Sequence, residues 1–209
     1  MLCRMDDARK VRDFWFGKMP LSAEQLPRRV KLWFGDVTEE TRQQVDEALR
    51  SRFGSLVERA IAGDLAQWAD GPRRRLSLIL LLDQFPRNIY RGTAQAFAGD
   101  EQALQLALTG MQSVADAALN VVERIFFYLP LQHAESLEVQ EESVAAYKRL
   151  LGEAPAELHG VFADCVGYAE RHREVIRRFG RFPHRNAVLG RAGTAEEEAW
   201  LREGGETFS

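Results

Sequence analysis

Residues 76–88 read LSLILLLDQFPRN, and this apolar run decides the fold of the chain. Leucine and isoleucine cover every face of the helix that the run predicts, so we expect this helix to be central and buried. We expect it to end near Gln84, because Pro86 has no N–H donor and disfavours helical geometry in the residue before it. Asp83 and Arg87 are then expected where a buried helix emerges from the core.

The Phe-Pro ending of this run is repeated later in the chain. Residues 84–88 read QFPRN (the first corner), and residues 181–186 read RFPHRN (the second corner). The second corner lies in the segment 171–191, which holds seven arginines and two histidines but a single acid, Glu174. Each corner follows an apolar helix. We therefore predict that the two corners together build one polar site.

The rest of the sequence also predicts helices, and no strand pattern competes with them. Thr38 is expected to begin a long helix, and Pro130 is expected to end a helix over residues 117–129. Thr194 and Glu197 have the spacing of a capping box. About eight helices joined by short loops give an all-α fold, and helix pairs stacked in sequence order would form an α-α superhelix.

Length and composition indicate one soluble globular domain over residues 1–209. The net charge of -3 argues against wholesale affinity for nucleic acid. Two cysteines, Cys3 and Cys165, are too few for a disulfide framework, so we expect a cytoplasmic protein. The first residues lack the apolar core of a signal peptide, and the longest apolar run is too short to span a bilayer, so no membrane is predicted as a partner.

Two longer stretches carry a resemblance to a known family. They are LLDQFPRNIYRG (81–92) and RFGRFPHRNAVLGR (178–191), with supporting matches DFWFG (13–17), YLPL (128–131) and YAERHR (168–173). On these motifs, which span almost the whole chain, the sequence resembles the bacterial DUF924 family. The resemblance implies an all-α, tetratricopeptide-like superhelix and implies no activity. The family often carries a serine where this chain has Ala134, so no serine nucleophile is expected there.

The arginines and histidines of the two corners point to an anion site. A guanidinium group grips carboxylate or phosphate through two parallel hydrogen bonds, and here arginine exceeds the nearby acids. We therefore expect a helical binding module whose pocket takes an anionic small molecule or an acidic peptide. The candidate ligand-binding residues are Asp83, Arg87, Asn88, Arg91, Arg124, His133, Arg181, Arg185 and Asn186.

Three alternatives stay open. An enzyme could use the same pocket for acid–base chemistry, with Glu123 or Asp83 working with His172 or His184. The charged groups could instead pair with one another in a purely structural network. An exterior basic strip could serve an RNA- or protein-interaction scaffold, although nucleic acid is not the favoured partner. The sequence holds no His-x-x-x-His motif, no two cysteines at the close spacing of metal ligands and no glycine-rich phosphate loop. No metal and no cofactor are therefore predicted.

Overall fold

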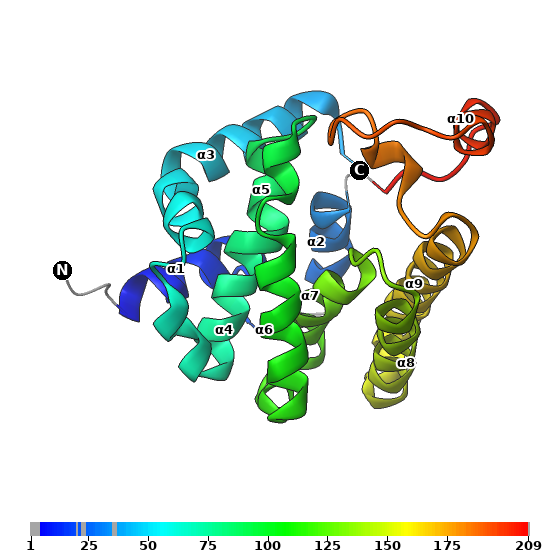
Figure 1. Cartoon of the computed structure of the whole chain (residues 1–209). Helices are drawn as coiled ribbons and strands as arrows, with labels where there is room; N and C mark the ends of the chain where they lie inside the picture. Colours follow the sequence, from blue (N-terminus) through cyan, green and yellow to red (C-terminus); the bar gives the residue numbers. More distant parts are fainter. Residues whose placement is uncertain (1–4, 20, 22–23, 35–36, 209) are drawn as a thin grey trace.

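The computed structural model describes residues 5–19, 21, 24–34 and 37–208, and Figure 1 shows them as a set of packed helices. No strand occurs in these ranges, so the predicted all-α class is confirmed. The tetratricopeptide-like superhelix stays a prediction. Within the described ranges, every helix is too short or too polar to cross a membrane.

The first part of the chain packs around an aromatic core. Its helices are α1 (Met5–Phe16), α2 (Gln25–Trp33) and α3 (Glu39–Ile61). Thr38 caps α3 as predicted, because its side chain accepts a hydrogen bond from the N–H of Thr41 at 3.3 Å. The ring of Trp15 lies 5.5 Å from Phe85 and 5.6 Å from Phe126, measured between centroids. These edge-on and tilted contacts join α1 to the centre of the molecule.

The central helix contains three consecutive parts and is buried as predicted. They are α4 (Pro72–Ile79), a π-helical turn (Leu80–Gln84) and α5 (Phe85–Ile89). Leu76, Ile79 and Leu81 are completely buried. The α4 segment packs against α1, α6 and α7. The first corner therefore starts from the middle of the fold.

The prediction that this helix ends before Pro86 is wrong. In the π turn, the N–H of Phe85 bonds to the carbonyl of Leu80, one residue further back than in an α-helix. The wider turn brings Pro86 into the first turn of α5, where proline is tolerated. The carbonyl of Leu82, to which Pro86 has no N–H to donate, lies against Gly99. A Cβ atom at Gly99 would be 2.3 Å from that oxygen, so only glycine fits.

The prediction that Pro130 ends a helix is also wrong. Pro130 does not end a helix but lies inside α7 (Val121–Gln132). Pro130 has no N–H to donate to the preceding turn, yet the N–H of His133 still bonds to the carbonyl of Leu129 at 3.1 Å. The helix therefore continues past the proline and delivers His133 to the end of α7.

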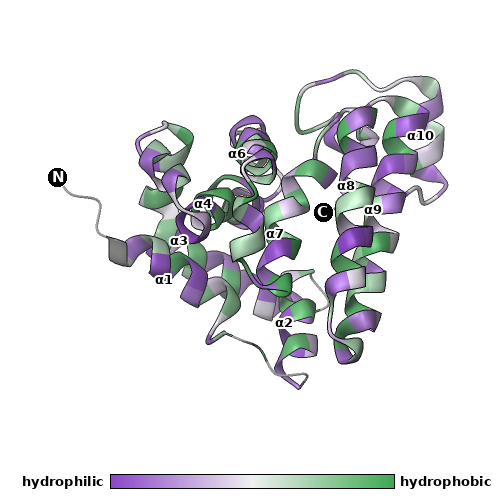
Figure 2. Cartoon of the chain, turned by 90° about the horizontal axis from the view of Figure 1, so that it is seen from below, coloured by the Kyte–Doolittle hydropathy of each residue, from purple (hydrophilic) through white to green (hydrophobic). Residues whose placement is uncertain are grey.

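The later helices complete the fold and carry the second corner. They are α6 (Asp100–Gln112), α8 (Leu137–Glu153), α9 (His159–Phe179) and α10 (Ala195–Arg202). Helices α8 and α9 lie side by side and antiparallel in Figure 1, and α7 packs against both. Most helices carry both polar and apolar segments in Figure 2, as helices with one buried face do. Gly180, with a φ of 72°, ends α9 and turns the chain into the second corner.

Candidate functional site

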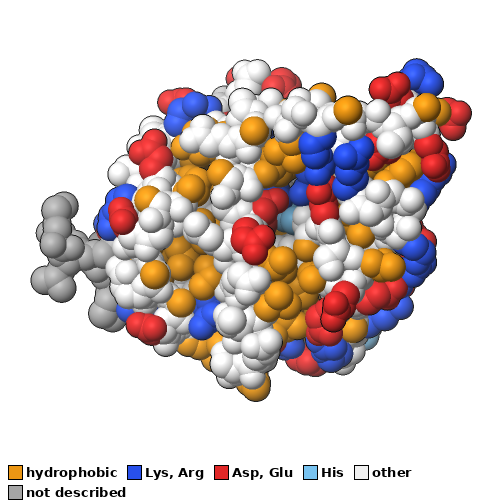
Figure 3. Space-filling model, viewed as in Figure 1, with side chains coloured by type: hydrophobic (Ala, Val, Ile, Leu, Met, Phe, Trp, Pro, Cys, Tyr) orange, Lys and Arg blue, Asp and Glu red, His pale blue; other side chains and the backbone are white. Residues whose placement is uncertain are grey.

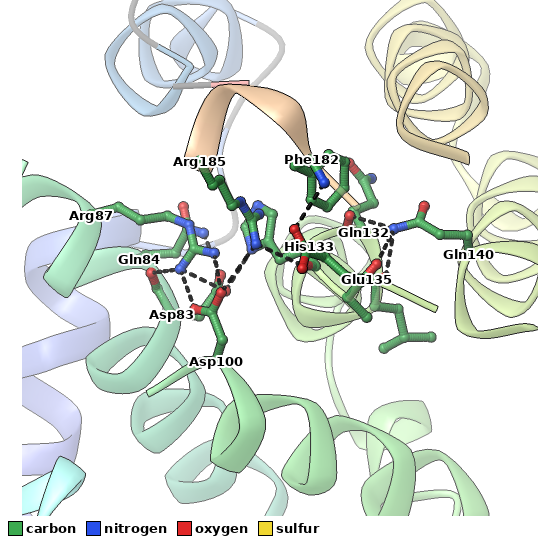
Figure 4. Close-up of polar contacts among 12 residues, drawn as sticks. Asp83, Gln84, Arg87, Asp100, Gln132, His133, Glu135, Gln140, Phe182 and Arg185 are labelled. Carbon is green, nitrogen blue, oxygen red and sulfur yellow. Dashed lines mark hydrogen bonds and ion pairs between the residues drawn. The ribbon is translucent and has the colours of Figure 1, made fainter. Parts of the chain in front are cut away.

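The two corners meet at one aspartate, Asp100, the first residue of α6. Arg87 of the first corner donates two hydrogen bonds to its carboxylate, at 2.8 and 2.9 Å. A guanidinium nitrogen of Arg185, from the second corner, lies 3.6 Å from the same carboxylate. Both guanidinium groups also lie over the ring of Phe97, 5.5 and 4.9 Å from its centroid. Segments far apart in the sequence therefore share one anchor, as Figure 4 shows.

A buried aspartate and histidine lie next to this junction. Asp83, in the π turn, is fully buried, and its Oδ1 lies 2.6 Å from Nδ1 of His133 and 3.2 Å from Arg87. The amide of Gln84 donates to the other oxygen at 2.5 Å. Burial alone raises the pKa of Asp83, but Arg87 and His133 outweigh it and hold this pKa well below its usual range. Burial and the charge of Arg87 lower the pKa of His133. The pair is therefore an ionised Asp83 and a neutral His133 that donates its Nδ1 proton.

A cavity of about 400 Å³ opens beside this network. Figure 3 shows charged side chains of both signs around a histidine in a hollow of this face. The aromatic side chains that line the cavity are Trp33, Phe34, Phe97, Tyr147, Tyr168 and Phe208. Its charged or hydrogen-bonding side chains include Arg42, Gln84, Arg87, Asn88, Arg91, Gln132, His133, His172 and His184. Within the described ranges, no aspartate or glutamate is among the lining residues.

The other two histidines of the cavity are also neutral. His172, on α9, donates from Nδ1 to the carbonyl of Tyr168 at 2.8 Å, and burial lowers its pKa to about 3. Burial likewise lowers the pKa of His184 to about 4. The buried Nδ1 of His184 has no hydrogen-bond partner in the described part of the chain. The rings of His133 and His172 lie 6.3 Å apart, so neutral imidazoles cluster on one side of the cavity.

Each corner is also tied to a helix elsewhere through one shared carboxylate. Asn88, in the first corner, donates to Asp46 of α3 at 2.8 Å, and Arg91, three residues further along, donates to the same group at 3.0 and 3.1 Å. In the second corner, the outer residues bond to a different helix. Arg181 and Asn186 both bond to Glu197 of α10, Arg181 at 2.6 and 2.7 Å and Asn186 at 3.3 Å. These contacts pin the corners in place, as the structural alternative requires.

The structure places the residues predicted for the site in three different positions. Those that line the cavity are Arg87, Asn88, Arg91, His133, His172 and His184. Those that support the lining from behind are Asp83, which bonds to His133, and Arg185, which donates to the His133 carbonyl at 3.0 Å. Those that lie elsewhere are Glu123, Arg124, Arg181 and Asn186.

Glu123 does not meet the histidines, because its carboxylate completes a capping box at the start of α7. The N–H of Asn120 donates to Glu123 at 3.1 Å, and the Asn120 side chain accepts from the N–H of Glu123 at 3.0 Å. Arg124 turns away to an ion pair with Glu153 and a bond to the hydroxyl of Tyr128 at 3.1 Å. The carboxylate that the structure brings to a histidine is therefore Asp83.

Sequence reasoning missed several residues that shape the site. In the sequence, Asp100 is an acid at the start of a predicted helix, which is common and does not indicate that it pairs with arginine. Phe97 and Phe34 gave no indication of a pocket, because an aromatic side chain more often packs in a core. Gln84 stood in the first corner but was assigned no role. Within the described ranges, no three His, Cys, Asp or Glu side chains form a group suited to a metal ion.

Comparison with known proteins is informative about the family. The sequence matches the family described as "Bacterial protein of unknown function (DUF924)" over residues 11–205. The fold is similar to the solved structure of a protein of unknown function, ATU0120, from Agrobacterium tumefaciens, with 34% identity and a TM-score of 0.75. That match covers 95% of this chain and 98% of the other. No curated protein matches the sequence. The chain therefore belongs to the DUF924 family.

Proposed function

We propose that this chain is a binding protein whose cavity takes a small anionic molecule or the acidic end of a peptide. One observation carries the proposal. The ionisable side chains facing the cavity in the described chain are arginines, neutral histidines, Tyr147, Tyr168 and Cys165, with no carboxylate among them. The cavity also has the size of small-ligand sites, about 300–1,000 Å³. Such a lining favours a ligand that supplies the negative charge itself.

Arg185 adds to this argument, because its positive charge is incompletely compensated. Its side chain is buried and its Nε has no partner in the described part of the chain, while Asp100 remains 3.6 Å from the other end of the group. Burial lowers the pKa of Arg185 to about 10, so the group is still charged at neutral pH. A buried charge without a close partner is costly. An anion in the neighbouring cavity would reduce that cost.

The carboxylates that hold the other arginines lie outside the lining of the cavity. Asp46 holds Arg91, and Asp83 and Asp100 hold Arg87, so the guanidinium groups occupy fixed positions before a ligand arrives. Donors that are already ordered lose less conformational entropy on binding. The same pairing leaves little net positive charge, so the proposed binding depends on directed hydrogen bonds more than on long-range attraction.

We also propose a bacterial cytoplasmic location and a tetratricopeptide-like arrangement of the helix pairs. The bacterial family and the free, buried thiol of Cys165 support the first. The packing of α7, α8 and α9 against one another supports the second.

A thermal-shift experiment tests the binding proposal. Wild type is compared with Arg42→Gln/Arg91→Gln, which removes two lining charges, and with Arg178→Gln as control. Arg178 is half-exposed and pairs with Glu196, as Arg91 pairs with Asp46, but it does not line the cavity. The probes are inorganic phosphate, acetate, phenylacetate and a short acidic peptide.

The proposal predicts that at least one probe raises the melting temperature of wild type and of Arg178→Gln by the same amount. The double variant should show a smaller rise, because a ligand stabilises only through its affinity for the folded state. Equal rises in all three proteins, or no rise with any probe, would contradict the proposal.

Acid–base catalysis in the same cavity is the second candidate, and the Asp83–His133 pair favours it. The carboxylate accepts the Nδ1 proton, which leaves Nε2 of His133 as a proton acceptor. Nε2 could take a proton from water as the water oxygen attacks an ester carbonyl, and return it to the leaving alkoxide. Cys165 also lines the cavity, but burial raises its pKa to about 12, so it is no nucleophile at neutral pH.

Hydrolysis of p-nitrophenyl acetate and butyrate tests this second candidate. Release of p-nitrophenolate above the rate of buffer alone, lost in His133→Gln and retained in Arg178→Gln, would support it. A rate equal in wild type and His133→Gln would contradict catalysis of ester hydrolysis by this pair.

A further inference from the structure

The segment that follows α10 turns back and reaches the cavity. Helix α10 ends at Arg202, and Gly204 has a φ of 84°, which reverses the chain. Gly205 donates its N–H to the carbonyl of Trp200 at 2.9 Å and lies against the Trp200 ring. A Cβ atom at Gly205 would be 2.3 Å from that ring, so glycine is required there. In Figure 1 the chain beyond α10 runs back toward the middle of the molecule.

This segment lays the ring of Phe208 face to face on His172. The two ring centroids are 3.5 Å apart and the planes differ by 20°. The edges of the slot are made by Phe182, 5.9 Å away, and by His184, 6.0 Å away, both nearly perpendicular to Phe208. Thr207 and Phe208 line the cavity together with His172 and His184. A planar ring therefore fills a three-sided slot in the cavity wall, which we call the ring slot.

Two walls of the ring slot are buried, whereas its occupant is only half-buried and makes few polar contacts. His172 and Phe182 are 4% and 0% exposed, while Phe208 is only half-buried. In the described chain, no backbone hydrogen bond joins residues 206–208 to any other segment. An ion pair links Glu206 of this segment to Arg171 at 2.8 Å, with both side chains 44% exposed. An ion pair that exposed contributes little to stability.

The ring slot lies close to the polar groups of the proposed binding site. His172, at its base, lies 6.3 Å from His133, which connects to Asp83 and Arg87. A second aromatic surface lies on another part of the cavity lining, where Phe34 and Tyr168 are stacked 6.3 Å apart and remain 41% and 44% exposed. A molecule with a planar ring and an acidic group would match both kinds of lining.

We propose that the ring slot is a subsite for the aromatic ring of the ligand, an aromatic carboxylate, and that Phe208 fills the slot when no ligand is bound. This inference rests on the proposed anion-binding function. The ring of the ligand replaces Phe208 against His172, and its carboxylate lies toward Arg87 and His133. Residues 206–208 then act as a competitor that the ligand displaces, since segment and ligand cannot occupy the slot together.

Titration calorimetry with two matched acids tests the inference. Phenylacetate carries a planar ring, and cyclohexylacetate carries a puckered ring on the same head group. Both acids are titrated into wild type, Phe208→Ala and the control Phe179→Ala. Phe179 is also a half-buried aromatic beside α10, packed 5.1 Å from Trp200, but it does not line the cavity. Circular dichroism verifies that each variant is folded.

We expect phenylacetate to bind more tightly than cyclohexylacetate, and its Kd to fall in Phe208→Ala. The fall is about tenfold if Phe208 leaves the slot open a tenth of the time, because the apparent Kd scales inversely with the open fraction. Phe179→Ala should bind like wild type. Binding of phenylacetate by Phe208→Ala alone would give the same support.

Two results would overturn the inference in distinguishable ways. In the first, both acids bind with equal affinity, and Phe208→Ala changes their Kd no more than Phe179→Ala does. The ring slot is then not a subsite, and the anion-binding proposal stands. If neither acid binds to any of the three proteins at millimolar concentration, while phosphate and the acidic peptide also fail to raise the melting temperature, both proposals fall.

Discussion

Replacing Asp100 with asparagine should show how strongly the two corners are joined. Asp100 accepts two hydrogen bonds from Arg87, at 2.8 and 2.9 Å, and is the carboxylate nearest to Arg185, at 3.6 Å. Breaking one partner of a buried ion pair costs about 3–5 kcal/mol. The side chains of Arg87 and Asp100 are 20% and 22% exposed, so solvent screens part of the charge. We therefore expect the free energy of unfolding to fall by about 2–3 kcal/mol.

Asp46→Asn is the matched control for this variant. Asp46 also accepts two hydrogen bonds from one arginine of the same segment, Arg91, but that arginine is 42% exposed. Its loss should cost less than about 1 kcal/mol. Urea unfolding followed by circular dichroism measures both values at neutral pH. Equal losses for Asp100→Asn and Asp46→Asn would refute the idea that the junction at Asp100 holds the site together.

Three further predictions concern pH, packing and capping. Burial lowers the pKa of His172 to about 3, so the unfolded state binds the proton first and the free energy of unfolding should fall as pH drops from about 6.5 toward that value. In urea titrations, His172→Asn should lose less of this free energy over the same pH range. Gly99→Ala should cost about 2 kcal/mol or more because its Cβ would meet the Leu82 carbonyl. Gly152→Ala, with open space around it, should not destabilise α8 in the same melts. Glu123→Ala, which removes the acceptor of the Asn120 N–H, should lower stability by about 1 kcal/mol and leave the affinity for any bound anion unchanged in calorimetry.

The helices could be predicted from local rules, and two of the errors came from prolines. Thr38 and the Thr194–Glu197 pair indicated helix starts, because their side chains can bond to the free N–H groups there. The structure has both caps. Pro86 and Pro130 were expected to end helices but lie inside them. A π turn before Pro86 and the position of Pro130 near the end of α7 remove most of the usual cost. Neither circumstance can be read from neighbouring residues.

The meeting of the two corners was predicted from their likeness, but the residue that joins them was not. Asp100 lies 12 residues after the first corner but about 80 residues before the second, and Gly99 beside it packs closely on the π turn. Local patterns describe helix ends, whereas the distance between ends depends on the packing of all the helices between them. The same reason explains the choice of Glu123. A carboxylate within an apolar helix suggested a site, but its position at the start of α7 makes it part of a capping box.

The sequence also could not decide whether the arginines are paired. It showed an excess of arginine over acid within residues 171–191. The acids that pair with Arg91 and Arg181 come from α3 and α10, outside the corners themselves. Arg87 and Arg91 are paired as well, yet both line the cavity, whereas the carboxylate of Asp100 lies 3.6 Å from Arg185. Pairing and a place in the cavity lining therefore occur together, and Arg181 is the corner arginine that pairing alone explains.

The central claim is that the cavity between the two corners binds an anion. Its most direct test is to titrate isotope-labelled protein with phenylacetate, and separately with inorganic phosphate and the acidic peptide, while NMR follows the backbone amides and the arginine Nε groups. The account predicts saturable shifts at Arg87, Arg91 and the three histidines of the cavity. Exterior arginines such as Arg173 and Arg177, which pair with Glu141 and Glu174, should not shift. Saturable shifts confined to those exterior residues, or no saturable shift with any of the three probes, would contradict the account.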